Sequence, residues 1–181
     1  MKYLVEPIRD KAKIYEVEEY LNKRSFRNKV IFVLGINSGL RVSDILSLNV
    51  GDVRNKTHID LCEKKTGKQK RFPINPKLAK LLNFYTKKKD DDEPLFVSQK
   101  RGRLDRSQVY RVINEACEAV GIDANVGTHT MRKTFGYHHY KQFRDVAMLQ
   151  KIFNHSSPDI TLRYIGIEQD EIDNSYRMFE L

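Results

Sequence analysis

The spacing of apolar residues predicts a chain made mainly of helices. Apolar side chains recur every three or four positions along most of the sequence, which is the spacing of one buried helix face. The run at 29–37 is almost unbroken and ends at the breaker pair Ser38-Gly39, so it predicts a deeply buried helix. Helices are expected at residues 14–21, 29–37, 43–48, 78–85, 109–120, 130–143, 145–154 and around 172–179.

Residues 52–75 follow a different pattern. This segment contains β-branched residues and two turn sequences, at 55–56 and 66–68. We therefore expect short antiparallel strands joined by hairpins, with Lys65 at a strand end or hairpin tip. The charged run 87–93 is expected to form an exposed loop. The predicted fold class is α+β, mainly α-helical with one small antiparallel β-sheet.

Composition makes nucleic acid the leading candidate partner. The 181 residues include 33 Lys and Arg against 24 Asp and Glu, a formal net charge of +9, which favours a polyanion. An anionic membrane surface ranks second, and a basic protein that is merely soluble is the alternative. Cys62 and Cys117 lie too far apart in the sequence to indicate a metal knuckle or a disulfide framework. No stretch reaches the ~20 apolar residues of a membrane span or resembles a signal peptide, so a cytoplasmic protein is expected.

An arginine at the start of a predicted helix is the first candidate phosphate ligand. Arg41 follows the turn at Gly39, lies between apolar neighbours that would bury its stem, and precedes Asp44 by about one helical turn. A guanidinium held by packing and by a carboxylate is preorganised to bind phosphate through two hydrogen bonds. The alternative is a structural ion pair between Arg41 and Asp44.

Two further pairs of residues are candidates for the site, although each pair alone is weak evidence of function. His129 and Arg132 lie three positions apart at a helix start, so their side chains share one face. His155 ends a predicted helix, and Tyr164 follows it nine residues later, across a Ser-Pro sequence interpreted as a break. Each of these residues on its own fits an ordinary surface or core role.

Six residues together resemble the active-site signature of the tyrosine recombinases, also called phage integrases. The motifs that carry the resemblance are Gly39-Leu40-Arg41-Val42-Ser43-Asp44, Lys65-Thr66-Gly67-Lys68 ahead of Pro73, His129-Thr130-Met131-Arg132, and His155 followed by Tyr164. Lys65 is preferred over Lys68 and Lys70 because it lies eight residues before Pro73, as on the family's hairpin. The resemblance runs from about residue 10 to the C-terminus.

The resemblance implies a role for each of the six residues. Tyr164 would attack the phosphorus of a phosphodiester and form a 3′-phosphotyrosyl bond. Arg41 and Arg132 would hold the non-bridging oxygens, and His155 would donate a further hydrogen bond. Lys65 would be the general acid toward the leaving 5′ oxygen, and His129 would accept the proton of the tyrosine.

The resemblance also sets expectations for domains and partners. Residues 1–181 are expected to form a single catalytic domain, without the separate N-terminal DNA-binding domain that completes the clamp around the duplex in most members. Three explanations fit the expected lack of that domain. The chain could be a fragment of a longer protein, a minimal recombinase helped by a partner, or a DNA-binding regulator that keeps the fold. The tail around Ile172, Tyr176 and Phe179 is expected to pack either against a neighbouring protomer on double-stranded DNA or against its own domain.

No cofactor is implied, since the phosphotyrosyl ester stores the energy for rejoining and needs neither ATP nor a metal. His138 and His139 do not indicate a metal site, because adjacent residues of a helix point to different faces. The expected function is site-specific DNA recombination. Two alternatives are a non-catalytic DNA-binding regulator, in which Tyr164 is idle, and a type IB topoisomerase that relaxes supercoils without strand exchange.

Overall fold

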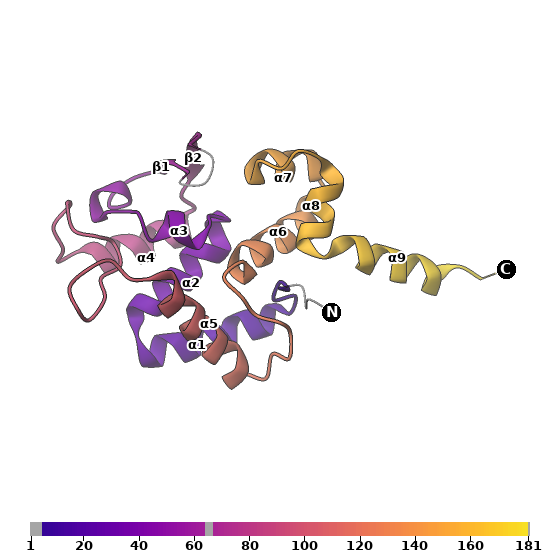
Figure 1. The fold of residues 1–181 in the computed structure, drawn as a ribbon, viewed down its shortest axis with the longest axis horizontal. Helices are drawn as coiled ribbons and strands as arrows, with labels where there is room; N and C mark the ends of the chain where they lie inside the picture. Colours follow the sequence, from indigo (N-terminus) through magenta and orange to yellow (C-terminus); the bar gives the residue numbers. More distant parts are fainter. Residues whose placement is uncertain (1–4, 64–66, 181) are drawn as a thin grey trace.

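The computed structural model describes residues 5–63 and 67–180, apart from the side chains of residues 168–171. Within these residues the chain is mainly helical with one antiparallel pair of strands, which confirms the predicted fold class (Figure 1). The elements in chain order are α1 Lys11–Arg24, α2 Phe26–Ser38, α3 Val42–Ile45, the 3-10 helix η1 Val50–Asp52, β1 His58–Cys62, β2 Gln69–Pro73, α4 Pro76–Thr86, α5 Arg106–Ala119, α6 Thr130–Phe143, α7 Val146–Phe153, α8 Pro158–Ile165 and α9 Ile167–Met178.

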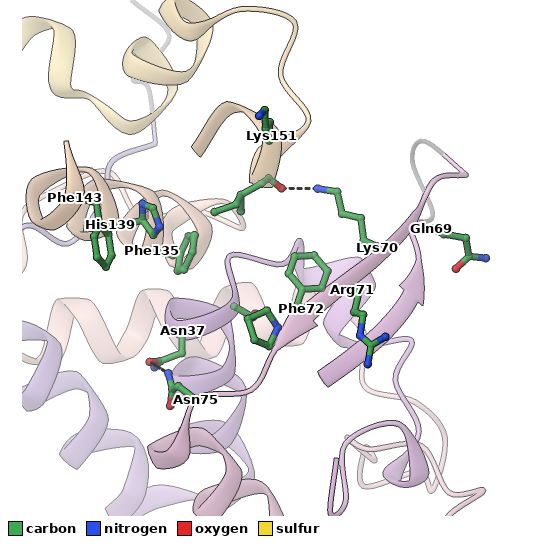
Figure 2. Close-up of a pocket in the computed structure, with 13 residues that line it drawn as sticks. Asn37, Gln69, Lys70, Arg71, Phe72, Asn75, Phe135, His139, Phe143 and Lys151 are labelled. Atoms are coloured by element: carbon green, nitrogen blue, oxygen red, sulfur yellow. Dashed lines mark hydrogen bonds between the residues drawn. The ribbon is translucent and has the colours of Figure 1, made fainter. Parts of the chain in front are cut away.

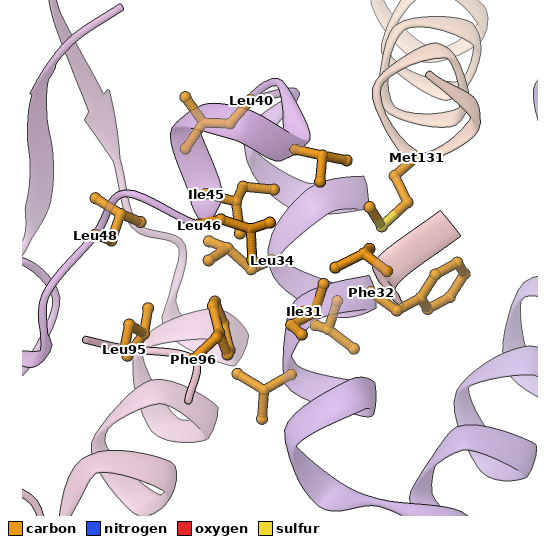
Figure 3. Packing of buried hydrophobic residues seen from close by; sticks show 14 of the residues in the cluster. Ile31, Phe32, Leu34, Leu40, Ile45, Leu46, Leu48, Leu95, Phe96 and Met131 are labelled. Atoms are coloured by element: carbon orange, nitrogen blue, oxygen red, sulfur yellow. The ribbon is translucent and has the colours of Figure 1, made fainter. Parts of the chain in front are cut away.

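Helix α2 is the centre of the main hydrophobic core. It packs against α1, α4 and α6, and its residues 30–34 are almost wholly buried (Figure 3). Burying a large apolar side chain contributes about 1.5–3 kcal/mol, so this helix anchors the N-terminal part of the fold. Helix α6 crosses α2 closely: a Cβ added at Gly35 would lie 2.7 Å from the sulfur of Met131. The first residues of α6 are thereby fixed against the end of α2.

A second, smaller core holds the C-terminal helices onto α6. Its buried members are Leu149, Phe153, Ile165 and Ile167. A Cβ added at Gly136 of α6 would lie 2.6 Å from Ile165 and 2.7 Å from Phe153, so glycine is required for this approach. Helices α7 and α8 are therefore placed by contact with the same helix that packs on α2, whereas α9 extends away from the rest of the molecule (Figure 1).

The strands form a hairpin whose inner face is apolar. β1 and β2 pair in antiparallel register from His58 opposite Pro73 to Cys62 opposite Gln69, with Ile59 and Phe72 buried. The expectation of paired strands is confirmed. In the described part of the segment, however, no strand precedes the turn at residues 55–56; the 3-10 helix η1 lies there instead, and the turn leads into β1.

The helix predictions are confirmed over most of the chain, with two corrections near the site. Helix α3 begins at Val42, one residue before the expected start at residue 43, and Arg41 occupies its N-cap position. The Ser157-Pro158 sequence starts helix α8 and does not interrupt the chain: the Ser157 hydroxyl accepts from the Ile160 amide, and proline fits the first helical position because its missing N–H is not needed there.

No helix in the described ranges combines the length and the apolar character that crossing a bilayer requires.

Candidate active site

Arg41 follows a turn whose backbone conformation and close packing require glycine at position 39. Gly39 ends α2 with φ 64°, a left-handed conformation, and a Cβ there would lie 2.5 Å from the ring of Phe135. The chain then extends through Arg41 into α3. The Arg41 guanidinium lies 2.8 Å from the carboxylate of Glu63 and 3.9 Å from that of Asp44. The close carboxylate partner of Arg41 is therefore Glu63, which the sequence pattern did not indicate.

Arg132 is buried on the first turns of α6 and is held by two backbone carbonyls. Its Nη1 donates to the Gly39 oxygen at 2.5 Å, and its Nη2 donates to the Phe153 oxygen at 3.0 Å. The guanidinium also lies 4.3 Å from the centre of the Phe153 ring, a cation–π contact. Since Gly39 ends α2 and Phe153 ends α7, Arg132 connects the two cores at the site.

Tyr164 and His129 form the hydrogen-bonded pair of the site. The Tyr164 hydroxyl lies 3.2 Å from Nδ1 of His129, the residue at the N-cap position of α6. Burial raises the pKa of Tyr164, and the charges of Arg132 and Arg41 oppose that rise. Burial, followed by the charge of Arg132, lowers the pKa of His129. His129 is therefore neutral at neutral pH, where Nδ1 can accept the phenolic proton.

His155 lies on the other side of the tyrosine ring. The two ring centres are 5.1 Å apart at a steep angle, and Nδ1 of His155 lies 3.0 Å from the hydroxyl of Thr161. Burial and then the charges of Arg132, Arg41 and Lys70 lower the pKa of His155 to about 4. The ring is therefore neutral across the physiological range, where it can take part in a hydrogen bond without carrying charge.

Five of the six residues predicted from the sequence converge in the described structure. The distances and charge interactions above join Arg41, His129, Arg132, His155 and Tyr164. The sixth, Lys65, lies outside the described residues.

Lys68 and Lys70, the two alternatives to Lys65, both reach toward the end of α7. Lys68 donates to the side chain of Asn154 at 3.2 Å, and Lys70 donates to the carbonyl of Ile152. Lys70 also lies 3.1 Å from the Glu63 carboxylate, and burial lowers its pKa. Neither contact is to the tyrosine, so both lysines have structural partners in this arrangement.

Sequence reasoning missed several side chains that contact the predicted site residues. Thr161 and Glu63 are fully buried, and Lys133 is 7% exposed with its ammonium 4.9 Å from the centre of the Tyr164 ring. Thr161 lies one turn before Tyr164, a position that would have drawn attention if α8 had been expected. Glu63 stands in a strongly charged segment, which is typical of exposed surface, and Lys133 is a lysine next to Arg132, so neither gave a signal of burial.

Comparison with known families settles which fold this is. The model of the family described as "Phage integrase family" matches residues 9–171. The chain belongs to the phage integrase family. It is 47% identical over 178 residues to the "Probable integrase/recombinase YoeC" of Bacillus subtilis, covering 98% of both chains. It spans about half the length of the curated relatives named tyrosine recombinase XerC and XerD, 53% and 56% in two examples.

Solved structures share the fold at low sequence identity. The crystal structure of XerA recombinase matches with a TM-score of 0.78 and 22% identity, over 100% of this chain and 68% of that one. A lambda integrase dimer bound to a COC′ core site matches with a TM-score of 0.74 and 16% identity, over 93% of this chain and 50% of that one. The predicted tyrosine recombinase catalytic-domain fold is thereby confirmed.

Proposed function

We propose that the protein cuts and rejoins DNA by transesterification through a 3′-phosphotyrosyl intermediate on Tyr164, as a site-specific recombinase or integrase. The observation that carries this proposal is the contact between the Tyr164 hydroxyl and His129, with the charges of Arg132 and Arg41 acting on the same phenol. A phenol beside a neutral base and two guanidinium groups is suited to attack on a phosphodiester.

The chemical step needs only side chains and the DNA. The Tyr164 oxygen attacks phosphorus while the bond from phosphorus to the 5′ oxygen breaks, and His129 takes the phenolic proton. Lys65 gives a proton to the departing 5′ oxygen. The reverse attack by the 5′-hydroxyl of another strand rejoins the DNA and returns the phenol, so the phosphoester bond energy is conserved.

Charge that develops on the phosphate oxygens is met by preorganised donors. Arg132 is fixed by two carbonyls and Arg41 by the Glu63 carboxylate, so neither guanidinium has to reorganise when phosphate arrives. His155 supplies a third donor. The single proton of the Thr161 hydroxyl has two acceptors within reach, Nδ1 of His155 at 3.0 Å and the Ser157 carbonyl at 3.3 Å. When the hydroxyl donates to Nδ1, the proton of the neutral ring is on Nε2, which can then donate to the phosphate.

Thr161→Val should therefore slow covalent DNA cleavage about 10-fold, because His155 loses the group that fixes its tautomer. The valine keeps the size of the buried side chain but loses its hydrogen bonds to His155 and Ser157, so the free energy of unfolding should also fall by about 1–3 kcal/mol. Single-turnover cleavage rates measure the effect, with Thr57→Val on the exposed approach to β1 as the control. Equal rates for Thr161→Val and wild type would show that Thr161 does not set the tautomer.

Double-stranded DNA is the proposed substrate, and the basic balance of the chain suits it, with a formal net charge of +9. The lambda integrase structure that this chain resembles is a dimer bound to its core site. We propose a cytoplasmic location, because DNA is the proposed substrate.

A suicide substrate tests the proposed function. A duplex nicked beside the cleavage site lets the short 5′-hydroxyl fragment diffuse away, so the covalent adduct accumulates. Candidate sites come from DNA that flanks the gene. A denaturation-resistant adduct that mass spectrometry maps to the Tyr164 peptide supports the proposal. Binding without an adduct would indicate a non-catalytic regulator, and relaxation of any supercoiled plasmid would indicate a topoisomerase.

We further propose that copies assemble on DNA through α9. Helix α9 extends from the body and exposes Ile172 by 44%, Tyr176 by 81% and Phe179 by 68% (Figure 1). A cavity of about 700 Å³ opens between β2, α6 and α7, with Phe72, Phe135 and Phe143 among its apolar residues and cationic side chains around them (Figure 2). The exposed apolar side chains of α9 would be removed from water if they docked in an apolar cavity of this kind.

Charge favours α9 of a second copy as the occupant of this cavity. Residues 168–173 include four acidic residues, and the cavity is flanked by Lys70, Arg71 and Lys151. Opposite charges at the edge of an apolar contact favour docking in one orientation. Within one chain α9 leads away from the body, so a neighbour's cavity is the simpler receptor (Figure 1).

The double variant Tyr176→Ser/Phe179→Ser should abolish multimers on DNA while single-site binding stays within about twofold, because the tail carries apolar contacts and not phosphate contacts. Mass photometry with a two-site duplex measures the assembly. Phe84→Ser removes an aromatic side chain that is 70% exposed on α4 and serves as the control. Unchanged assembly of the double variant would contradict a role for α9.

A further inference from the structure

A fully buried carboxylate lies between two cations beside the proposed phosphate site. Glu63 directly follows β1 and is 0% exposed. Its Oε1 lies 2.8 Å from Nη1 of Arg41 and 3.1 Å from Nζ of Lys70. Removing a carboxylate from water is costly unless it is closely paired, and a hydrophobic side chain of similar size would avoid that cost. The position of Glu63 is therefore explained better by what it holds than by stability.

Lys70 carries the influence of Glu63 across to the C-terminal helices. Its ammonium also donates to the carbonyl of Ile152 on α7, a contact that Figure 2 shows as a dashed line between β2 and α7. The carbonyl of the next residue, Phe153, accepts from Arg132 at 3.0 Å. One carboxylate thus contacts Arg41 directly and is joined to the support of Arg132 through Lys70 and the end of α7.

The carboxylate of Glu63 reduces the repulsion between the cations around it. Arg41, Arg132 and Lys70 are close enough to affect one another: both arginines lower the pKa of Lys70, burial lowers it most, and Glu63 raises it. Without Glu63, the ammonium of Lys70 and the guanidinium of Arg41 would face each other with no anion between them. Repulsion would move at least one of them from its place.

We propose that Glu63 is a positioning residue that sets the geometry of both arginines, Arg41 by direct ion pairing and Arg132 by way of Lys70 and the C-terminal end of α7. The inference rests on the proposed DNA strand transfer for its functional consequence. Lys70 is accordingly a tether between the hairpin and α7.

Glu63→Gln tests the role of the charge at nearly constant shape. Single-turnover formation of the covalent adduct should be slowed about 10- to 100-fold, because electrostatic donors lose preorganisation. The dissociation constant for DNA should stay within about twofold, since many phosphate contacts outside the site dominate binding. Glu63→Asp keeps the charge and should recover part of the rate. Asp60→Asn, which removes an exposed carboxylate of β1, is the matched control and should cleave as wild type does.

Two comparisons would overturn the proposal. Glu63→Gln that cleaves at the wild-type rate shows that the carboxylate positions nothing. Glu63→Gln and Glu63→Asp that are equally slow, with equally lowered melting temperatures, show a purely structural role. The double variant Glu63→Gln/Lys70→Met decides between the two connections: it stays slow if Arg41 depends on Glu63, and full recovery would limit Glu63 to neutralising Lys70 and reject the direct role.

A measurement without DNA separates this inference from the proposed function. Nitrogen-15 NMR of the Arg41 side chain reports whether its Nε–H is ordered in the free protein. We expect an ordered signal in wild type and Asp60→Asn, and loss of order in Glu63→Gln. If wild type forms no adduct on any bound site, the strand-transfer proposal fails, while an Arg41 signal unaffected by Glu63→Gln would reject the positioning role independently.

Discussion

Tyr164→Phe should lower covalent cleavage by roughly 10⁵-fold or more, below detection, because removal of a nucleophile has effects of that order. The phenyl ring can keep the contacts that the tyrosine ring makes with Phe153 and His155, at 5.5 Å and 5.1 Å between ring centres. DNA affinity and melting temperature should therefore stay close to wild type. Adduct formation on a suicide substrate is the measurement.

Tyr15→Phe is the matched control, since this tyrosine is 64% exposed on α1, outside the site. It should form the adduct at the wild-type rate. An adduct that persists in Tyr164→Phe would identify a different nucleophile and remove the central assignment of the proposed mechanism.

Arg132→Lys is expected to cost about 100-fold or more in cleavage rate even though the charge is kept. A guanidinium bonds the carbonyls of Gly39 and Phe153 and still offers N–H groups to phosphate, whereas an ammonium has three donors on one atom and cannot span those positions. The lost buried hydrogen bonds should also lower the free energy of unfolding by about 1–3 kcal/mol. Single-turnover kinetics and denaturant unfolding measure the two effects.

Arg24→Lys controls for the exchange itself, because Arg24, the last residue of α1, makes an exposed ion pair with Glu115 of α5. Its cleavage rate and stability should match wild type. If Arg132→Lys cleaved as fast as wild type, the two-carbonyl anchor would be irrelevant to phosphate binding.

The sequence predicted those elements whose signals are local. Helix α6 occupies Thr130–Phe143, the range that apolar spacing indicated, and α5 covers most of the stretch 109–120 where a helix was expected. Helix α8 was missed because Ser157-Pro158 was interpreted only as a break. The same pair is typical of a helix start, where serine caps and proline needs no donor. The error was a choice between two meanings of one dipeptide.

The candidate site was predictable as a set of residue types, but its internal contacts were not. Arg41 and Tyr164 could be chosen from motif order. The contact of Glu63 with Arg41 and of Arg132 with the Gly39 carbonyl join residues 22 and 93 positions apart along the chain. Such pairs depend on how α2, α6 and the hairpin pack, which no local pattern specifies.

The anchoring of Arg132 also bears on the order in which the protein becomes reactive during synthesis. One of its carbonyl partners, Gly39, is made early, and the other, Phe153, leaves the ribosome late, followed by Tyr164. Because chains fold progressively from the N-terminus, a nascent chain that has completed the α2 core still lacks both the second anchor and the nucleophile. An unfinished copy therefore lacks the residue on which the proposed covalent intermediate would form.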